Sequence, residues 1–263
     1  MSPKRVCLAM SGGVDSAAAA LLLRRQGYEV HAVTLRLRPG DDRSGVCGSE
    51  DDIVLAQKVA AAMGVEHTVL DLCGLFRDTV MKHFTAEYVR GRTPNPCVDC
   101  NRKIKFGALM DWALDHGMDA LATGHYARVD YDEAAGRWRL LRGLDRRKDQ
   151  SYFLFQLTQA QLAHLLLPVG GYEKGDIRAL AADHGLENAQ KPDSQDICFV
   201  PDGDYAAFLE RQGVTLRQGN FVDASGRVLG PHRGLERYTT GQRKGLGVSA
   251  GEPVYVLRKD LAS

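Results

Sequence analysis

Short apolar segments alternate with longer amphipathic segments along the N-terminal part of the chain. Four apolar runs have the length of buried β-strands: RVCLAM at 5–10, YEVHAVTLR at 28–36, EHTVLDL at 66–72 and DALATG at 119–124. Four segments between or after them have the pattern of helices: AAAALLLRRQ at 17–26, EDDIVLAQKVAAAM at 50–63, LFRDTVMKHFTAEYVR at 75–90 and one that starts near Asn101. This alternation is typical of βαβ units, so we predict an α/β fold with a doubly wound parallel sheet.

The pattern changes in two places. Residues 131–142 predict a β-hairpin with DEAAGR as its turn. After Cys198, the segment 202–213 predicts a short helix, and the glycine-rich remainder predicts short strands joined by turns. We therefore expect a first domain over residues 1–200 and a small, mainly β second domain over residues 201–263.

Composition narrows the class of protein. Of the 263 residues, 44% are hydrophobic and 25% are charged, which is ordinary for a globular protein. The longest apolar run, Ala17–Leu23, is too short to cross a bilayer, and the N-terminal apolar stretch is too short for a signal peptide. The sequence therefore predicts a cytoplasmic protein without a membrane partner.

Charge and cysteine content give two further expectations. The net charge is only +1, so nucleic-acid binding would depend on local basic patches, which occur at 101–106, 139–148 and 241–245. Six cysteines in an intracellular chain indicate metal or redox chemistry more than structural disulfides. Cys7 lies within an apolar strand and is interpreted as a core residue.

A glycine-containing loop joins the first predicted strand to the first predicted helix. Its sequence is Ser11-Gly12-Gly13-Val14-Asp15-Ser16. Backbone N–H groups at a helix N-terminus attract anions, and glycines let a phosphate approach the backbone. Asp15 would organise the loop or help to hold Mg²⁺. The alternative is a tight connection without a ligand. The loop lacks the Walker lysine and the third glycine of the dinucleotide fingerprint.

This loop resembles the PP-loop of ATP pyrophosphatases, which adenylate a substrate oxygen. Together with GRTPNPCVDCNRKIKFG (91–107), ATGHYAR (122–128), RRKDQSYFL (146–154), KPDSQDICFV (191–200) and YTTGQRKGLG (238–247), the chain resembles the tRNA-specific 2-thiouridylases of the MnmA type. The resemblance extends from about Arg5 to about Val256. It implies ATP and Mg²⁺ as cofactors and tRNA as a partner.

Replacing a uracil oxygen by sulfur requires a good leaving group and a strong sulfur nucleophile. Adenylation supplies the first, and a cysteine persulfide supplies the second. We expect Cys100 to precede a helix that begins at Asn101, so that the helix dipole, Arg102 and Lys103 favour its thiolate.

The resemblance assigns the sulfur chemistry to two cysteines. Cys198 would carry a persulfide received from an upstream sulfur donor, either a cysteine desulfurase or a persulfide relay protein. Cys100 would be the nucleophile that assists sulfur release, ending as a Cys100–Cys198 disulfide. Asp15 completes the catalytic set.

Cys97 opens a different mechanism. Three thiolates could hold an iron–sulfur cluster, with Cys97, Cys100 and Cys198 as its ligands. A structural zinc would need a fourth ligand, for which the candidates are Cys47, Cys73 and His125.

The resemblance also implies substrate contacts. Nucleotide contacts fall on Ala9, Met10, Ser11, Gly12, Gly13, Val14, Asp15, Ser16, Leu35 and Gly124. Contacts with tRNA fall on Asn95, Pro96, Cys97, His125, Lys148, Asp149 and Gln150. Members of this family usually continue into a β-barrel domain, so we expect either a truncated chain or a short form. Two alternatives stay open: a sulfurtransferase acting on another RNA or a small substrate, and a non-catalytic RNA-binding or sulfur-carrier module.

Overall fold

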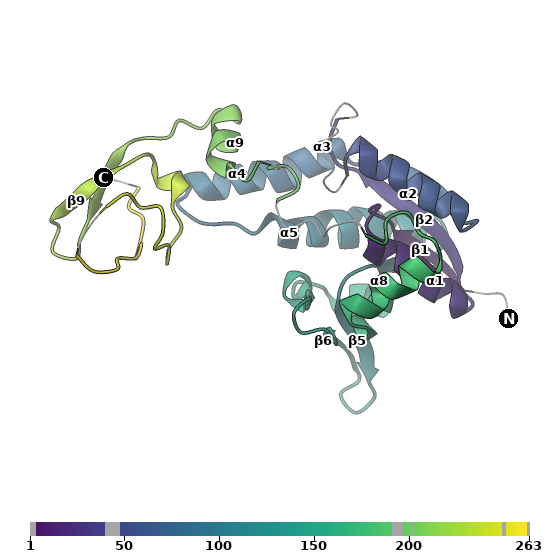
Figure 1. Cartoon of the computed structure of the whole chain (residues 1–263). Coiled ribbons are helices and arrows are strands. Elements are labelled where there is room, and N and C mark those ends of the chain that lie inside the picture. The colour runs from purple at the N-terminus through teal and green to yellow at the C-terminus, as the bar shows by residue number, and fades with distance from the viewer. Residues whose placement is uncertain (1–3, 40–47, 191–196, 201, 249–250, 262–263) are drawn as a thin grey trace. The chain divides into compact units, whose positions relative to one another are not determined.

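The computed structural model of this protein describes residues 4–39, 48–190, 197–200, 202–248 and 251–261 (Figure 1). The chain divides into two compact units. One comprises Met1–Thr79 and Cys97–Cys198, and the other comprises Val80–Pro96 and Phe199–Ser263. In the described part of the chain, no helix has the length and apolar character needed to cross a membrane.

The first unit is built on a five-stranded parallel sheet, which confirms the predicted fold class. Its strands, in spatial order, are β3 (Glu66–Asp71), β2 (Glu29–Arg36), β1 (Arg5–Ala9), β4 (Ala120–Thr123) and β7 (Leu165–Leu166). The four predicted strands are present. The hydrophobic pattern did not identify β7, because two residues carry no periodicity.

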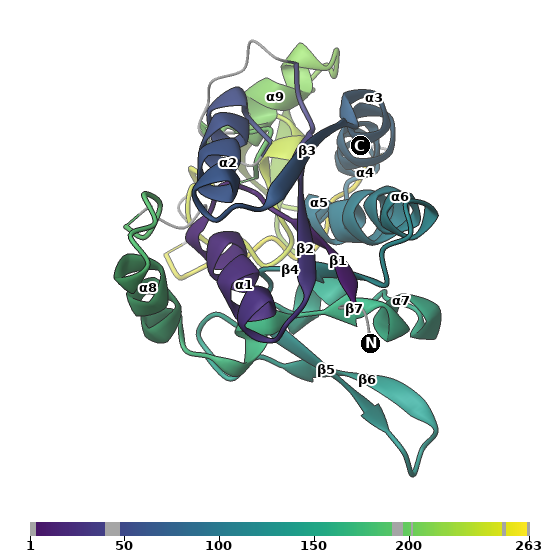
Figure 2. The same ribbon diagram turned by 90° about the vertical axis from the view of Figure 1, so that its right-hand side faces the viewer.

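Helices cover both faces of this sheet (Figure 2). On one face lie α1 (Val14–Arg25), α2 (Glu50–Ala62) and α8 (Lys174–Asp183), and on the other lie α6 (Met110–Asp115) and α7 (Gln159–Ala163). The alanine run 17–20 of α1 is fully buried. Because alanine side chains are small, α1 packs closely on the sheet, and its N-terminus is held at the carboxyl end of β1.

The helix that carries Cys100 differs from the prediction. It begins with α5 (Pro96–Asp99), continues through η2 (Cys100–Leu109), which has the i→i+5 hydrogen bonds of a π-helix, and ends with α6. The start expected at Asn101 is therefore wrong. Proline fits the first position of a helix, where its missing N–H costs no hydrogen bond, so the helix already begins at Pro96.

A β-hairpin and short helical turns complete the first unit. The hairpin pairs β5 (Ala127–Asp132) with β6 (Arg137–Arg142), so it begins four residues earlier than the pattern indicated. The predicted helix over 75–90 is found as three consecutive segments, α3 (Cys73–Phe76), η1 (Arg77–Met81) and α4 (Lys82–Val89). The short turns are η3 (Ser151–Leu154) and η4 (Pro168–Gly171).

The second unit combines α4, α9 (Tyr205–Arg211), the antiparallel pair β8 (Gly219–Val222) and β9 (Val228–His232), and the turn η5 (Leu235–Arg237). Aromatic packing explains why residues 80–96 belong to it. The ring of Phe84 lies 5.2 Å from that of Phe199, and Tyr88 stacks on Tyr205 at 5.2 Å. This unit therefore contains a segment that the division of the sequence at residue 200 assigned to the first domain.

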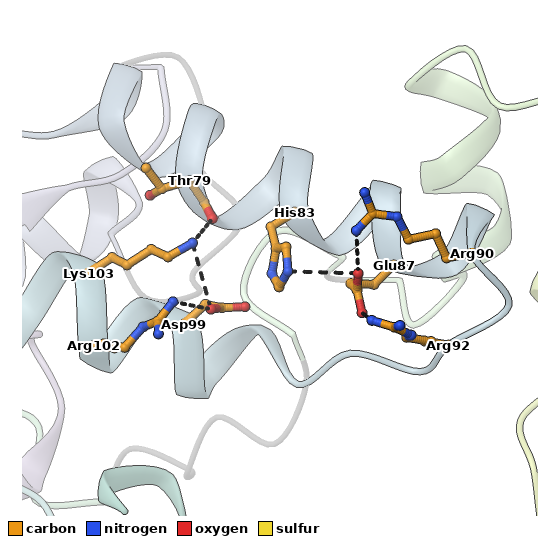
Figure 3. Close-up of polar contacts among 8 residues, drawn as sticks. All are labelled: Thr79, His83, Glu87, Arg90, Arg92, Asp99, Arg102 and Lys103. Atoms are coloured by element: carbon orange, nitrogen blue, oxygen red, sulfur yellow. Dashed lines mark hydrogen bonds and ion pairs between the residues drawn. The ribbon is translucent and has the colours of Figure 1, made fainter. Parts of the chain in front are cut away.

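The polar side of α4 is organised by Glu87. Its carboxylate accepts hydrogen bonds from Arg90 at 3.0 Å and from Arg92 at 3.1 Å, and His83 lies 4.0 Å away (Figure 3). These hydrogen bonds lower the pKa of Glu87. Arg90 and Arg92 thus tie the end of α4 to the start of the segment that follows it.

Candidate nucleotide and sulfur-transfer site

The loop between β1 and α1 is wound by its own hydroxyl groups. The Ser11 backbone N–H donates to Ser16 Oγ at 3.2 Å, and Ser16 Oγ donates to the Gly13 carbonyl at 3.0 Å. Helix α1 begins with Gly13 as its N-cap residue, without a side-chain hydrogen bond that caps it. The first N–H groups of α1 are consequently available to an anion.

Gly12 holds this loop against α2. Its φ is +74°, and a Cβ atom there would lie 2.7 Å from the Asp52 carbonyl oxygen. The carbonyl of Gly12 accepts a hydrogen bond from Asn188 Nδ2 at 3.0 Å. A side chain at this position would therefore require both an unfavourable backbone conformation and displacement of the neighbouring backbone.

Gly124 brings the end of β4 against the same helix. A Cβ atom at Gly124 would lie 2.9 Å from the backbone nitrogen of Ser16. The order of the sheet reverses between β1 and β4, where Ala9 pairs with Thr123. In doubly wound sheets, ligands bind in the crevice at this switch point, beyond the carboxyl ends of the strands.

A cavity of about 390 Å³ lies at this switch point. Nine of the ten residues predicted to contact the nucleotide line this cavity. They are Ala9, Met10, Ser11, Gly13, Val14, Asp15, Ser16, Leu35 and Gly124. The tenth, Gly12, is buried and does not line it. Three residues that we had assigned to tRNA also line the cavity, namely His125, Lys148 and Gln150. The structure therefore places these three beside the nucleotide loop.

Lysines give the cavity a cationic lining. Besides Lys148, the cavity contains Lys105 from η2 and Lys174 from the start of α8. Sequence reasoning did not identify either lysine as a residue of this cavity. Lys105 lies within the basic segment 101–106, but nothing in the local sequence around Lys174 links it to a loop about 160 residues earlier. The combination of helix N–H groups and three lysines suits a polyphosphate.

The predicted catalytic residue Asp15 is bonded to one of these lysines. Lys174 Nζ lies 2.7 and 2.8 Å from the two Asp15 carboxylate oxygens, and the Tyr126 hydroxyl donates to Asp15 Oδ1 at 2.8 Å. Lys174 is itself buried, with 8% of its surface exposed. The pair places one cation and one anion at the base of the loop Ser11–Ser16, called the phosphate loop below.

His125 lies at the end of β4 in its neutral form. Burial, and then the charge of Lys105, lower the pKa of His125 well below its ordinary value. Its Nδ1 is 2.7 Å from Thr123 Oγ1. An imidazole that stays neutral beside a cationic cavity adds no charge of its own and can donate or accept one hydrogen bond.

The loop 143–151 is closed by Asp149. One carboxylate oxygen accepts the backbone N–H groups of Gly143 at 2.9 Å and Ser151 at 3.1 Å. Burial opposes ionisation of Asp149, but these hydrogen bonds and that of the Ser151 hydroxyl lower its pKa. Gln150 is fixed to Tyr126, whose N–H donates to Gln150 Oε1 at 3.0 Å. Asp149 thus shapes the loop that presents Lys148 and Gln150.

Cys100 and the cavity share one helix. Cys100 begins η2, and Lys105, five residues later, lines the cavity. In an α-helix these positions would lie on different sides, but i→i+5 hydrogen bonding makes them neighbours one turn apart. The π-helical register therefore puts Cys100 and Lys105 on one side of the helix, although Cys100 does not itself line the cavity.

The cations assigned to the Cys100 thiolate have other partners. Asp99 Oδ1 lies 3.9 Å from Arg102 and 3.8 Å from Lys103, and Lys103 Nζ donates to the Thr79 carbonyl at 3.2 Å (Figure 3). The predicted position of Cys100 before the helix is wrong, whereas the effect of these two cations on its thiolate stays a prediction. Cys97, not Cys100, occupies the first turn, because the helix begins at Pro96.

The remaining cysteines fall into separate environments. Cys97 is exposed, whereas Cys100 and Cys198 are partly buried. Cys7 is fully buried, which confirms its role as a core residue, and this burial raises its pKa to about 12. Burial and then Asp71 raise the pKa of Cys73 to about 11. Cys47 lies outside the described residues.

The described residues contain no preformed metal site. There, no three His, Cys, Asp or Glu side chains gather as a metal site. The set Cys97, Cys100 and Cys198 is therefore not assembled as cluster ligands. A Mg²⁺ ion bound mainly by nucleotide phosphates needs only one or two carboxylates, and Asp15 and Asp52 line the cavity.

The parallel sheet, the glycine-containing loop and the lysine-lined cavity define a nucleotide-binding α/β protein. Family models agree: residues 4–202 match the tRNA methyl transferase HUP domain, and residues 206–263 match the tRNA methyl transferase PRC-barrel domain. The chain is 52% identical over 261 residues to the tRNA-specific 2-thiouridylase MnmA of Carboxydothermus hydrogenoformans, covering 97% of this chain and 71% of the relative. The chain belongs to the tRNA-specific 2-thiouridylase family.

Other relatives carry the same name. The MnmA proteins of Heliobacterium modesticaldum and Pelotomaculum thermopropionicum are 51% and 46% identical, over 97% and 99% of this chain and 68% and 73% of their own lengths. Among solved structures, a 4-thiouridine synthetase–RNA complex with bound ATP has a TM-score of 0.47 and 18% identity, covering 80% of this chain and 50% of that chain. That likeness is too distant to bear on function.

Proposed function

We propose that this protein uses ATP to replace the oxygen at C2 of the tRNA wobble uridine by sulfur. The observation that carries the proposal is the position of Lys105 in the nucleotide cavity, one π-helical turn from Cys100. One helix thereby links the site suited to ATP with the residue suited to sulfur chemistry. Membership of the 2-thiouridylase family supports the same activity.

The first step activates the uridine. The N–H groups at the start of α1 and the side chains of Lys105, Lys148 and Lys174 bind the phosphates of ATP. The C2 oxygen of uracil attacks the α-phosphorus, the bond to the β-phosphate breaks, and pyrophosphate leaves with the electron pair. Asp15 would hold Mg²⁺, which neutralises phosphate charge when bound. The lysines stabilise the negative charge that develops on the departing pyrophosphate.

The second step transfers sulfur from Cys198. The terminal sulfur of a Cys198 persulfide attacks C2 and adds to it. Cys100 then attacks the Cys198 sulfur, so that the S–S bond of the persulfide breaks and its electron pair stays on the transferred sulfur. That pair forms the C=S bond as AMP leaves. The products are 2-thiouridine, AMP and a Cys100–Cys198 disulfide, which a thiol reductant must reduce before the next cycle.

Several partners and contacts belong to the proposal. A cysteine desulfurase or a persulfide relay protein would deliver the sulfur, and the reaction would take place in the cytoplasm. Asn95, Pro96 and Cys97 are the proposed contacts with the target base. Along the sequence, residues 1–200 are the proposed catalytic domain and residues 201–263 the proposed small β-rich domain, with residues 80–96 of the former packed in the second unit.

Nucleoside analysis tests the proposal. The protein is incubated with unmodified tRNA, ATP, Mg²⁺ and a persulfide donor, and the digested tRNA is examined by mass spectrometry. We expect 2-thiouridine to form only when ATP is present, together with AMP. Wild-type protein that binds ATP but forms no 2-thiouridine under these conditions would contradict the proposal.

A further inference from the structure

Two exposed aromatic rings lie on the first unit, one in η3 and one directly after it. Tyr152 is 65% exposed and Phe155 is 61% exposed, and their ring centroids lie 6.1 Å apart. Isolated exposed apolar residues are common, but adjacent exposed rings indicate a surface that contacts something. We call Tyr152 and Phe155 the ring pair.

The winding of the segment explains why both rings face outward. A 3₁₀-helix has three residues per turn, so positions i and i+3 lie on the same side. Tyr152 lies in η3 and Phe155, the residue that directly follows η3, keeps a helical backbone and the same spacing. Leu154, between them, is 1% exposed and anchors the turn in the core. The same anchoring that buries Leu154 therefore holds the two rings in solvent.

The segment is held at two points beside the proposed active site. On one side, Gln150 lines the nucleotide cavity and accepts the Tyr126 N–H. On the other side, Asn101, the residue after Cys100, donates from Nδ2 to the Phe153 carbonyl at 3.2 Å. The ring pair thus lies on a segment that connects the nucleotide cavity to the helix of the sulfur-transfer cysteine.

Cationic side chains lie next to the ring pair along the chain. Because Gly143 and Ser151 both donate to one oxygen of Asp149, the two ends of the loop meet, and Arg142 and Tyr152 leave from neighbouring points. The Arg142 side chain is 73% exposed, and Arg146 and Arg147 within the loop are also exposed. Aromatic rings beside exposed arginines are the combination that binds single-stranded nucleic acid.

We propose that the ring pair stacks unpaired nucleobases that flank the target uridine of tRNA, while Arg142, Arg146 and Arg147 contact the neighbouring phosphates. This inference rests on the proposed function and adds a positioning surface to it. The positive charge around the rings favours RNA over the apolar face of a partner protein. Stacking tolerates any base, so the ring pair fixes where the flanking nucleotides lie and not which sequence is bound.

The test compares three variants of the full chain: Y152A/F155A, Y152F, and the control Y131A. Tyr131 is an exposed aromatic residue of the hairpin in the same unit. Binding is measured by fluorescence anisotropy with labelled tRNA, and stacking by the fluorescence of 2-aminopurine placed beside the uridine in an anticodon-loop oligoribonucleotide. ATP binding and circular dichroism monitor folding.

We expect Y152A/F155A to weaken tRNA binding about tenfold or more and to abolish quenching of 2-aminopurine. The KM for tRNA should rise while ATP binding stays unchanged, and Y152F and Y131A should resemble the wild type. Unchanged quenching and affinity in the double variant would overturn the inference, as would a defect only in sulfur delivery from a donor protein. If the wild type forms 2-thiouridine but the double variant is normal, only this inference fails. If the wild type binds no tRNA, the proposed function and the inference fail together.

Discussion

Lys174 and Asp15 face each other at the base of the phosphate loop, with 2.7 and 2.8 Å between the ammonium nitrogen and the two carboxylate oxygens. The two residues are 159 positions apart in the chain. Both line the cavity proposed to bind ATP. Because Asp15 is also the proposed Mg²⁺ ligand, the pair holds in place a cation and an anion that would both engage Mg²⁺-ATP.

Replacing Lys174 by alanine should reduce nucleotide-dependent activity. The variant loses a buried cation beside the phosphates, so we expect kcat/KM for ATP to fall about a hundredfold or more. Pyrophosphate release in the presence of tRNA measures the effect. Lys58→Ala is the matched control, because Lys58 is an exposed lysine of α2 outside the nucleotide cavity. Equal activity of the two variants would remove Lys174 from the mechanism.

Gly12 and Gly13 should respond differently to alanine. Gly12 combines a φ of +74° with a Cβ position 2.7 Å from the Asp52 carbonyl, so Gly12→Ala should lower the free energy of unfolding by about 2 kcal/mol or more. At Gly13, φ is −81° and the nearest atom would be Ser11 Oγ at 3.5 Å. Gly13→Ala should therefore change the free energy of unfolding by less than about 1 kcal/mol. Urea unfolding of both variants measures these free energies. Equal losses of stability in the two variants would refute this account of Gly12.

Serine substitutions distinguish the roles of three cysteines. Cys100→Ser and Cys198→Ser should abolish 2-thiouridine formation while ATP binding remains, because each removes one sulfur of the proposed transfer. Cys97→Ser should stay active. Mass spectrometry of tRNA nucleosides is the measurement, with iron and sulfide analysis of anaerobically purified protein. A Cys97→Ser variant that loses both activity and iron would instead support the cluster hypothesis.

The pH dependence of stability should reveal His125. Its pKa is lowered in the folded state, so the unfolded chain binds the proton more readily once the pH falls below the ordinary histidine value. The contribution of neutral His125 to the free energy of unfolding is fully present above about pH 6.5. As the pH falls below that value, the free energy of unfolding decreases by at most about 1.4 kcal/mol per pH unit. In His125→Asn, the free energy of unfolding should therefore fall less steeply than in the wild type between pH 7 and pH 5. Identical slopes for variant and wild type would show that His125 titrates normally.

Alkylation with iodoacetamide at pH 8 should separate the thiols by environment. The pKa of Cys7 is about 12, so at pH 8 only about one molecule in ten thousand carries its thiolate. The pKa of Cys73 is about 11, so about one molecule in a thousand carries its thiolate. Exposed Cys97 should react first. Peptide mass spectrometry over time measures the order, and a urea-unfolded sample serves as the control in which all thiols react. Rapid labelling of Cys7 in the folded protein would contradict its burial.

Much of the first unit follows from local sequence. Four of its five strands and the loop Ser11–Ser16 were predicted because strand periodicity, glycine and helix N-terminal preferences act over a few residues. The two-residue strand β7 and the early start of the helix at Pro96 were not predicted. The first is too short to have a pattern, and the second depends on a proline that suits either a turn or a first helical position.

The sequence by itself determined the parallel α/β class and the loop Ser11–Ser16, because each depends on residues close in the chain. The pair Cys100 and Cys198 comes from ordered motifs and stays a prediction. Only the tertiary structure decided that Lys174 meets Asp15, that Lys103 serves Asp99 and the Thr79 carbonyl, and that a π-helical register brings Cys100 and Lys105 onto neighbouring turns. Those relationships depend on packing between distant segments and on one hydrogen-bond register among several that the same residues allow. Local propensity specifies neither.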